Sequence, residues 1–347
     1  MTKTPTVTLL TDDLTMILLL SAAAFVLGML LTPIYTYFAY RYKFWKRQRT
    51  TSTNGEKLKV FLRLHKEKFE RNIPTMAGMI TVISVASVTL AFNMDRAETW
   101  LPLAALIGGG FVGLIDDIIN VRGRGGGVAG LRTSVKFMAI TVLGTSLGWY
   151  FAVKLGYDAV HLPFLGDWVI GWWMIPLFAF AVVAMGNAVN ISDGLDGLAG
   201  GLSAIAYGAF GVIATLQGHE LLAGFCFTVL GALLAYLWFN IYPARFFMGD
   251  VGSFALGTSL GVVAMMTNTF FLLPVIGIVF VIEAGSSSLQ ILSKKFFHRK
   301  IFLSAPIHHH LEAVGWPETK VTMRFWVLGA GAAFTGILLA LTGGHIL

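Results

Sequence analysis

The sequence has 347 residues, of which 56% are hydrophobic and 12% are charged, and its mean hydropathy is +0.74. This balance excludes an ordinary soluble domain. The single cysteine, Cys226, lies in an apolar run, which excludes an internal disulfide and any site with several cysteine ligands. The net charge of +7 would suit nucleic-acid binding, but in a membrane protein basic residues first report orientation.

Apolar runs of about the length that crosses a bilayer recur along the whole chain. Together with the polar breaks between them, they predict an all-α integral membrane protein. We expect a single polytopic domain over residues 1–347 with about ten transmembrane helices. The predicted spans are 15–40, 75–93, 99–115, 135–153, 173–189, 199–217, 220–240, 252–268, 270–293 and 322–343.

Ten spans place both termini on one side of the membrane. The loops on the other side, with the helix ends beside them, hold all but three of the 25 Lys and Arg residues; the exceptions are Lys3, Arg96 and Lys154. Since positive loops resist translocation, we expect the basic side in the cytoplasm and both termini in the periplasm or outside. The predicted cytoplasmic loops are about 41–74, 116–134, 190–198, 241–251 and 294–321.

Two of the segments between spans have a distinctive composition. The segment 154–173 is rich in Gly, Pro and aromatic residues, which predicts a short outer excursion such as an interfacial hairpin. The longest polar stretch, 41–72, carries eleven basic residues, which is typical of a cytoplasmic loop near anionic lipid.

Five aspartates fall at predicted cytoplasmic helix ends: Asp116, Asp117, Asp193, Asp196 and Asp250. The adjacent carboxylates of Asp116 and Asp117 repel unless a cation or a proton lies between them, which suits a divalent metal. A pair of solvated loop aspartates is the equally simple alternative.

The stretch between Asn187 and Gly197 interrupts two apolar runs. Asn190, Asp193 and Asp196 recur every third residue, so a helical turn would place them on one face. A helix cap needs one such polar group and not several, which favours a functional role. Asp250 precedes another apolar helix and could act there as its N-cap.

Three consecutive histidines, His308, His309 and His310, lie well inside the chain. Consecutive side chains diverge, so we do not expect all three to bind one ion; one or two could bind phosphate or a base. Oxygen ligands without cysteine favour magnesium or manganese, and magnesium lets substrate phosphates complete its coordination. These features indicate phosphoryl transfer at the cytoplasmic interface, and the absence of a GxxxxGK[ST] motif argues against a Walker-type ATPase.

The residues also resemble a known family. Its marks are Pro74–Gly78, Gly113–Asp117, Asn187–Gly197, Phe247–Ser253 and Ala305–His310, continued by Gly315–Glu318 and Arg324–Trp326. Over nearly the whole chain the sequence resembles the polyprenyl-phosphate N-acetylhexosamine-1-phosphate transferase superfamily (glycosyltransferase family 4). The histidine block is similar to that of its phospho-N-acetylmuramoyl-pentapeptide-transferase branch.

The resemblance implies a ten-span fold and a Mg²⁺-dependent reaction. Phospho-MurNAc-pentapeptide would pass from UDP-MurNAc-pentapeptide to undecaprenyl phosphate, giving lipid I and UMP in the first membrane step of peptidoglycan synthesis. The implied location is the bacterial cytoplasmic membrane. The implied partners are both substrates, membrane lipids and a second copy of the chain in a homodimer, without nucleic acid.

The resemblance also assigns residues. The resemblance implies Asp250, together with Asp117, as the magnesium ligands. It implies that Asp116 and Asp117 activate the lipid phosphate or attack the donor directly. His308 is the further member of the implied catalytic set. A lysine usual in the family is Asn120 here, so neutralising the diphosphate would fall more heavily on Lys136. The residues implied in substrate binding are Lys68, Thr75, Lys136, Asn190, Asp193, Asp196, Asn240, Phe247, Gln290, His309 and His310.

Three other function classes compete with this reading. A secondary transporter would carry its carboxylates near the midplane in paired broken helices, whereas these lie at predicted cytoplasmic ends. An intramembrane metalloprotease would need His-Glu-x-x-His, which is absent. A sister transferase for UDP-GlcNAc would use the same metal chemistry, and the histidine block argues against it.

Overall fold

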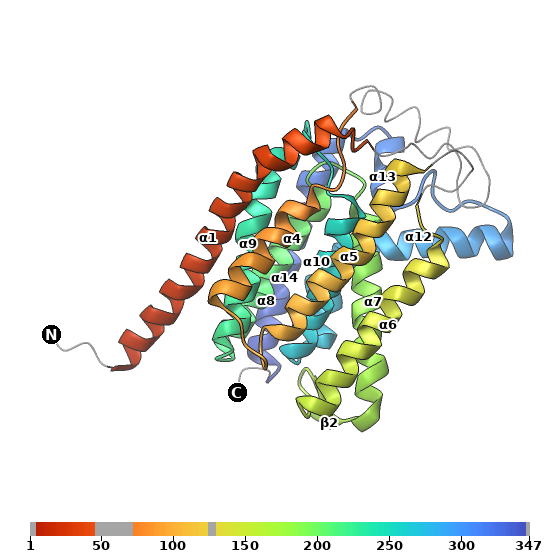
Figure 1. Cartoon of the computed structure of the whole chain (residues 1–347). Coiled ribbons are helices and arrows are strands. Elements are labelled where there is room, and N and C mark those ends of the chain that lie inside the picture. The colour runs from red at the N-terminus through yellow and green to blue at the C-terminus, as the bar shows by residue number, and fades with distance from the viewer. Residues whose placement is uncertain (1–4, 46–71, 124–129, 345–347) are drawn as a thin grey trace.

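The structure is a computed structural model that describes residues 5–45, 72–123 and 130–344. Most of them lie in a bundle of helices (Figure 1). The helices are α1 (Pro5–Arg41), α4 (Gly78–Phe92), α5 (Trp100–Arg122), α6 (Thr133–Trp149), α7 (Met174–Ser192), α8 (Leu198–Leu216), α9 (Glu220–Asn240), α10 (Gly249–Met266), α11 (Leu273–Ile276), α12 (Ile278–Phe297), α13 (Ile307–Ala313) and α14 (Glu318–Thr342). Short turns η1 (Tyr150–Lys154), η2 (Gly171–Trp173) and η3 (Phe270–Leu272) and strands β1 (Ala159–Leu162) and β2 (Gly166–Val169) complete them.

Every predicted span contains a helix. In the described part of the chain, eight helices are long and apolar enough to cross a membrane, or nine if a bent pair counts as one span. The remaining predicted span, 75–93, contains α4, which has only 15 residues. The prediction of a helical integral membrane protein is therefore confirmed, and by length the spans number eight or nine.

Two predicted helix boundaries are wrong. The span 270–293 is not straight, because α11 and α12 meet at Gly277 with a bend of 82° and α12 then leaves the bundle (Figure 1). Helix α5 continues to Arg122, so the aspartate pair lies inside a helix and not in the loop expected from residue 116. The residues after the pair, which include Ile118 and Ile119, continue the helical pattern that the two carboxylates had interrupted.

Helix α10 forms the centre of the bundle. All residues of its spanning window are buried, and it packs against α5, α7, α4 and α8. Small residues allow this close packing, as is usual between membrane helices. At Gly113 of α5, an added Cβ would lie 2.1 Å from the backbone oxygen of Asp250, so this crossing requires glycine. The same crossing brings the ends of α5 and α10 together.

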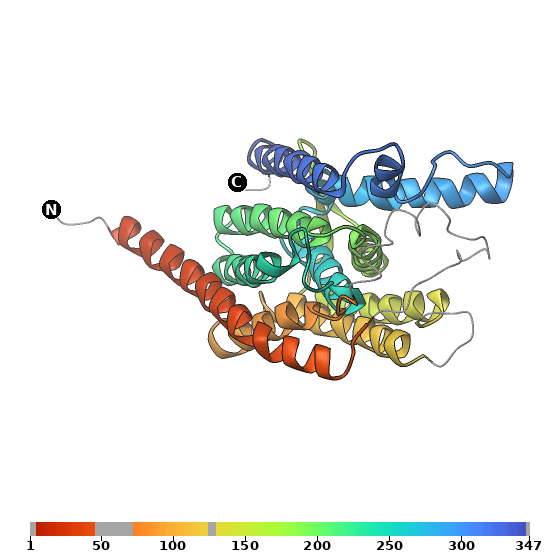
Figure 2. The same cartoon turned by 90° about the horizontal axis from the view of Figure 1, so that it is seen from above.

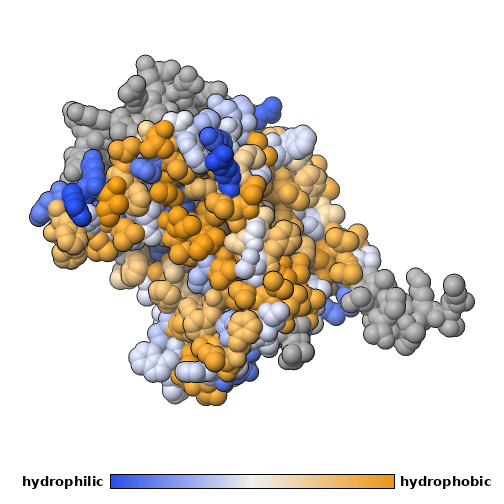
Figure 3. Space-filling model, turned by 180° about the vertical axis from the view of Figure 1, so that it is seen from behind, coloured by the Kyte–Doolittle hydropathy of each residue, from blue (hydrophilic) through white to orange (hydrophobic). Residues whose placement is uncertain are grey.

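Helix α1 has a different environment. It packs on α9 and α4 at one end, while its other end reaches beyond the rest of the bundle (Figure 2). Large apolar side chains such as Leu18, Leu19 and Leu30 are exposed along it. Apolar side chains also cover most of the sides of the molecule, and hydrophilic ones gather mainly at the end that carries α13 (Figure 3). We call this the basic end.

The predicted hairpin is confirmed. Strands β1 and β2 pair antiparallel at the end of the molecule opposite the basic end (Figure 1). His161 of β1 fixes the hairpin, because its Nδ1 lies 2.7 Å from a carboxylate oxygen of Asp167 and its Nε2 lies 2.8 Å from the backbone oxygen of Gly343. The hairpin is thereby tied to the end of α14.

Candidate active site

Three charged side chains meet at the basic end. Lys136 of α6 places its Nζ 3.2 Å from Oδ2 of Asp116 and 3.0 Å from Oδ2 of Asp250. Both carboxylates are buried, and Asp116 also accepts a hydrogen bond from the Leu131 backbone at 2.5 Å. One ammonium group thus joins aspartates that are 134 positions apart in sequence, and it offsets the repulsion between them. We call Asp116, Asp117, Asp250 and Lys136 the carboxylate cluster.

Asp117 faces the beginning of α10. Its Oδ2 accepts a hydrogen bond from the Val251 backbone at 3.0 Å, where the first turn of a helix has unsatisfied N–H groups and a partial positive charge. Gly249 has a φ of +76°, and an added Cβ would lie 2.6 Å from this carboxylate oxygen. Asp250 lies in the same turn and makes no capping bond with its own helix, so the alternative of an N-cap role for it is wrong. The carboxylate that accepts a hydrogen bond from the first turn of α10 is that of Asp117.

The segment around Thr75 holds the loop before α10 in place. The Phe247 backbone donates to the Pro74 carbonyl at 2.8 Å, and the Ala77 and Gly78 backbones donate to the carbonyls of Phe247 and Met248. Tyr35 of α1 donates its hydroxyl to the Thr75 carbonyl at 2.5 Å. Thr75 and the segment that begins at Phe247 therefore lie beside the carboxylate cluster.

Asn190, Asp193 and Asp196 do not share a helical face, so that prediction is wrong. Helix α7 ends at Ser192, and a turn that includes Gly197 with a φ of +76° separates it from α8. Asn190 donates to the hydroxyl of Ser253 in the first turn of α10 at 2.9 Å. Asp193 is half-buried directly after α7, and Asp196 is buried further along the same turn.

Asp196 and Asn240 hold backbone segments together. Asp196 accepts from the Ala244 backbone at 3.0 Å, and its own N–H donates to Glu318 at 2.6 Å. Asn240 accepts from the Gly197 N–H at 3.0 Å and donates to the Phe246 carbonyl at 2.9 Å. The two side chains join the α7–α8 turn to the α9–α10 loop, so we call them the bracing pair.

Gln290 makes a similar set of backbone contacts. Its Oε1 accepts from the N–H groups of Ile301 and Phe302 at 3.0 and 3.1 Å, and its Nε2 donates to the Phe302 carbonyl at 3.0 Å. These bonds hold the chain after α12 against that helix. The Leu303 N–H continues the contact by donating to Nδ1 of His310 at 3.2 Å.

The histidines have separate partners, as expected. His308 is fully buried, and its Nδ1 lies 2.7 Å from Oε2 of Glu283, which is also fully buried. His309 pairs instead with Glu312 at 2.8 Å within α13. The Nε2 of His308 points toward the α7–α8 turn, since a Cβ added at Gly194 would lie 2.3 Å from it.

The sequence interpretation missed Glu283 and Glu318. Glu283 is the single acidic residue of the apolar run 270–293, and an ionisable residue in such a run is itself a signal of function. Glu318 is in the quoted Gly315–Glu318 motif but received no role, because only the fold brings it to Asp196. Lys68, predicted to bind substrate, lies outside the described residues.

The donor chemistry fits a hard divalent cation. Within residues 5–45, 72–123 and 130–344, no three His, Cys, Asp or Glu side chains are arranged to hold a metal without further ligands. However, Asp116 and Asp250 already share the ammonium group of Lys136, and Asp117 follows Asp116 on α5. Magnesium needs only one or two protein carboxylates when substrate phosphates supply the rest, so these residues fit it.

Comparison with known proteins points to one family of transferases. The profile of "Glycosyl transferase family 4" matches residues 99–268, which include both aspartates of α5, Lys136 and Asp250. The phospho-N-acetylmuramoyl-pentapeptide-transferase of Chloroflexus aurantiacus is 41% identical over 96% of this chain and 92% of its own length. The protein of the same name from Geobacillus thermodenitrificans is 36% identical over 93% of this chain and 97% of its own. A third, from Chloroflexus aggregans, is 40% identical.

Proposed function

Since the chain belongs to the phospho-N-acetylmuramoyl-pentapeptide-transferase family, we propose that its carboxylate cluster is the catalytic centre. The protein is a multi-pass bacterial membrane transferase of peptidoglycan synthesis. It transfers phospho-MurNAc-pentapeptide from UDP-MurNAc-pentapeptide to undecaprenyl phosphate, forming lipid I and UMP. The assignment of individual residues to this reaction is our proposal.

The observation that carries the proposal is the position of Lys136 between two buried carboxylates. Phosphoryl transfer spreads negative charge over the phosphate in the transition state, and catalysis depends on cationic groups already in place. When the donor diphosphate binds, Lys136 can exchange part of its contact with Asp116 or Asp250 for a phosphate oxygen. This role compensates for Asn120, which stands where the family usually has a lysine.

Magnesium is part of the proposal. Asp250 and Asp117 are the residues that would hold it, since both carboxylates lie at the start of α10. When bound, the ion neutralises charge on the donor diphosphate. The N–H group of Val251 keeps Asp117 oriented toward this position.

Asp116 and Asp117 are the residues proposed to start the transfer to the acceptor, undecaprenyl phosphate. One of them either takes the proton of the undecaprenyl phosphate, which then attacks the donor, or attacks the donor phosphate itself. Lys136 and the Leu131 N–H hold Asp116 in one orientation, which both routes require. The two routes differ in one product: only direct attack gives UMP from the donor in the absence of lipid.

The nucleotide sugar is proposed to lie between the α9–α10 loop and the α7–α8 turn. Phe247 would stack on the uracil ring, while Asn190 and Asp193 would face the sugar. His308 presents its Nε2 beside Gly194 from the opposite side of this turn. The bracing pair and Gln290 would shape this site through the backbone segments that they hold, and Thr75, His309 and His310 would line it.

The test is UMP release by the purified protein, with UDP-MurNAc-pentapeptide or UDP-GlcNAc as donor, with and without undecaprenyl phosphate and Mg²⁺. We expect turnover only with the first donor, with lipid and with Mg²⁺. Turnover with UDP-GlcNAc alone would overturn the assignment of the donor. Full activity in the presence of a chelator would overturn the role of magnesium.

Orientation and assembly are further parts of the proposal. The distribution of Lys and Arg puts the basic end in the cytoplasm, where the soluble donor is found. The apolar side chains exposed along α1, such as Leu18, Leu19 and Leu30, offer a surface to a second copy of the chain and support a homodimer. Mass measurement by light scattering in detergent would test the dimer, and cysteine labelling of Thr342→Cys from the periplasm would test the orientation.

A further inference from the structure

A groove lies between α1, the end of α9 and the loop that follows α9. Its volume is about 710 Å³, within the range of sites for small ligands. The residues that line it are Thr32, Pro33, Thr36, Tyr37, Tyr40, Phe239, Arg245 and Phe246. The stretch of α1 from Thr32 to Tyr40 is about 12 Å long at 1.5 Å per residue, which is enough for half of an acyl chain.

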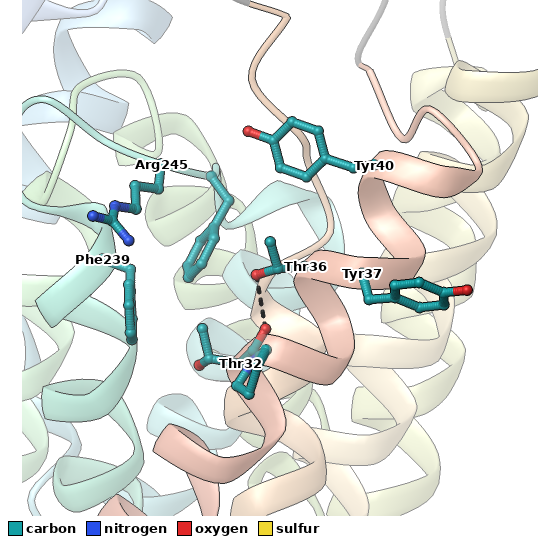
Figure 4. Close-up of a pocket in the computed structure, with 8 residues that line it drawn as sticks. Thr32, Thr36, Tyr37, Tyr40, Phe239 and Arg245 are labelled. Carbon is teal, nitrogen blue, oxygen red and sulfur yellow. Dashed lines mark hydrogen bonds between the residues drawn. The ribbon is translucent and has the colours of Figure 1, made fainter.

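The groove is polar only at its outer end. Figure 4 shows Arg245 and Phe239 on one wall and Thr32, Thr36 and Tyr40 on the other, with the Tyr40 hydroxyl turned toward the Arg245 side. The hydroxyl of Thr36 donates to the Thr32 carbonyl at 2.8 Å and so is satisfied within α1. The inner part of the groove therefore offers mainly apolar surface to an occupant.

Arg245 makes no salt bridge with another described residue. Its guanidinium lies 5.9 Å from the centre of the Phe239 ring, and the salt bridges found between described side chains involve other residues. An arginine at the basic end, beside a mainly apolar groove between two helices that are apolar enough to span a membrane, complements an anionic group on an apolar chain. A soluble anion would leave the apolar part of the groove without a partner.

We propose that the groove between α1 and α9 binds an anionic phospholipid of the surrounding bilayer. The headgroup phosphate contacts Arg245 and the Tyr40 hydroxyl, and one acyl chain lies along α1 from Thr36 to Thr32. The site differs from the place proposed for undecaprenyl phosphate, because none of the residues that line the groove belongs to the carboxylate cluster. It requires no assumption about the transfer reaction.

The floor of the groove connects it to the active site. Phe246 packs its ring 5.5 Å from Tyr35 and 5.7 Å from Phe239, and its carbonyl accepts the Asn240 side chain. The next residue, Phe247, begins the segment that leads to Asp250. A lipid that packs on Phe246 would therefore stabilise the loop that carries the catalytic carboxylate.

Native mass spectrometry of the full chain, titrated with phosphatidylglycerol or phosphatidylcholine, tests the proposal without using activity. In wild type we expect the tightest site to prefer phosphatidylglycerol by roughly fivefold, the effect of one basic residue at a membrane surface. Arg245→Gln should abolish this preference. Thr36→Phe, which fills the groove and keeps the charge, should remove the site for both lipids.

Lys295→Gln is the matched control, because it removes an exposed positive charge near the end of α12 and outside the groove. It should bind phosphatidylglycerol as wild type does. The proposal fails if Arg245→Gln keeps the preference or if Lys295→Gln loses it equally. It also fails if glycerol phosphate or undecaprenyl phosphate displaces phosphatidylglycerol from the tightest site, since the occupant would then be a soluble anion or the acceptor. If Thr36→Phe does not fold, the Arg245→Gln result still decides.

Discussion

The carboxylate cluster and the bracing pair lie next to each other but use their polar groups differently. In the cluster, Lys136 bonds to the side chains of Asp116 and Asp250. In the bracing pair, Asp196 and Asn240 bond to backbone groups of neighbouring segments. An ion pair between side chains can be exchanged for a substrate or a metal, whereas a bond to a buried backbone group must persist for the fold to hold. Substitutions in the two regions should therefore change different quantities.

The largest effect is expected for Asp250→Asn. Loss of this carboxylate weakens the hold on Lys136 and on the proposed magnesium ion, whose positive charges compensate the diphosphate mainly in the transition state, so kcat should fall on the order of a hundred- to a thousand-fold. The melting temperature should change little. UMP release and thermal unfolding of the same preparation measure both. Asp158→Asn, at an exposed position of the hairpin segment, should leave both unchanged; near-normal kcat in Asp250→Asn would remove this residue from the catalytic set.

Lys136→Gln tests the cluster without substrate. It leaves two buried carboxylates without their common cation, which should destabilise the protein by about 3 kcal/mol in the presence of a chelator. If the same carboxylates hold magnesium, added Mg²⁺ should restore part of this loss in the variant and change wild type less. Thermal unfolding with EDTA or Mg²⁺ measures the difference. An identical response to Mg²⁺ in both proteins would argue against a metal at this position.

Asn240→Ala should act mainly on stability. The Gly197 N–H and the Phe246 carbonyl would both lose a buried partner, at a cost of about 2 to 4 kcal/mol in the free energy of unfolding. Activity should fall at high temperature and recover substantially on cooling. Asn187→Ala is the control, since its side chain bonds to the Val183 carbonyl of its own helix. Loss of kcat at all temperatures with unchanged unfolding would show that Asn240 acts on substrate directly.

Glu283→Leu should impair binding of the donor. Glu283 holds Nδ1 of His308 and so determines how Nε2 is presented to the α7–α8 turn. We expect KM for the nucleotide donor to rise roughly tenfold with a smaller change in kcat, because a misplaced contact group weakens positioning. Glu283→Gln can still accept from Nδ1 and should restore most of the affinity. Equal KM values in wild type and Glu283→Leu would exclude this positioning role.

The smallest effect concerns Glu98 and His219 at the opposite end of the molecule, 3.5 Å apart. The hydrogen bond with Glu98 raises the pKa of His219 above 6.5, although burial acts against it. Burial raises the pKa of Glu98, but hydrogen bonds from His219 and Leu222 outweigh it and bring the pKa below 4.5. The stability that His219 contributes is complete below pH 6.5 and is lost as the pH rises through the raised pKa of this histidine. The stability that Glu98 contributes is complete above pH 4.5 and is lost as the pH falls through the lowered pKa of this glutamate.

The pair should therefore stabilise the protein most between pH 4.5 and 6.5. His219→Gln should lower the melting temperature at about pH 5.5 more than at about pH 8.5, by an amount that corresponds to less than about 1 kcal/mol, because both groups are partly exposed. Thermal unfolding at the two pH values checks it. The same decrease at both values would show that the histidine acts through packing alone.

The amino-acid sequence by itself determined the class of protein, the hairpin and the residues that gather at the basic end. Apolar runs of bilayer length leave few alternatives to membrane helices, and rare carboxylates in such a chain are conspicuous. It also indicated that the three histidines would not bind one ion together, since consecutive side chains point in different directions.

The tertiary structure decided which of these polar residues meet. Lys136 is 114 positions from Asp250, Glu283 is 25 from His308, and Glu318 is 122 from Asp196. No local pattern encodes such distances, because they follow from glycine-mediated crossings such as that of Gly113 with α10. The extension of α5 through Asp117 was missed because a charged group can remain in a helix when a distant part of the chain provides its partner.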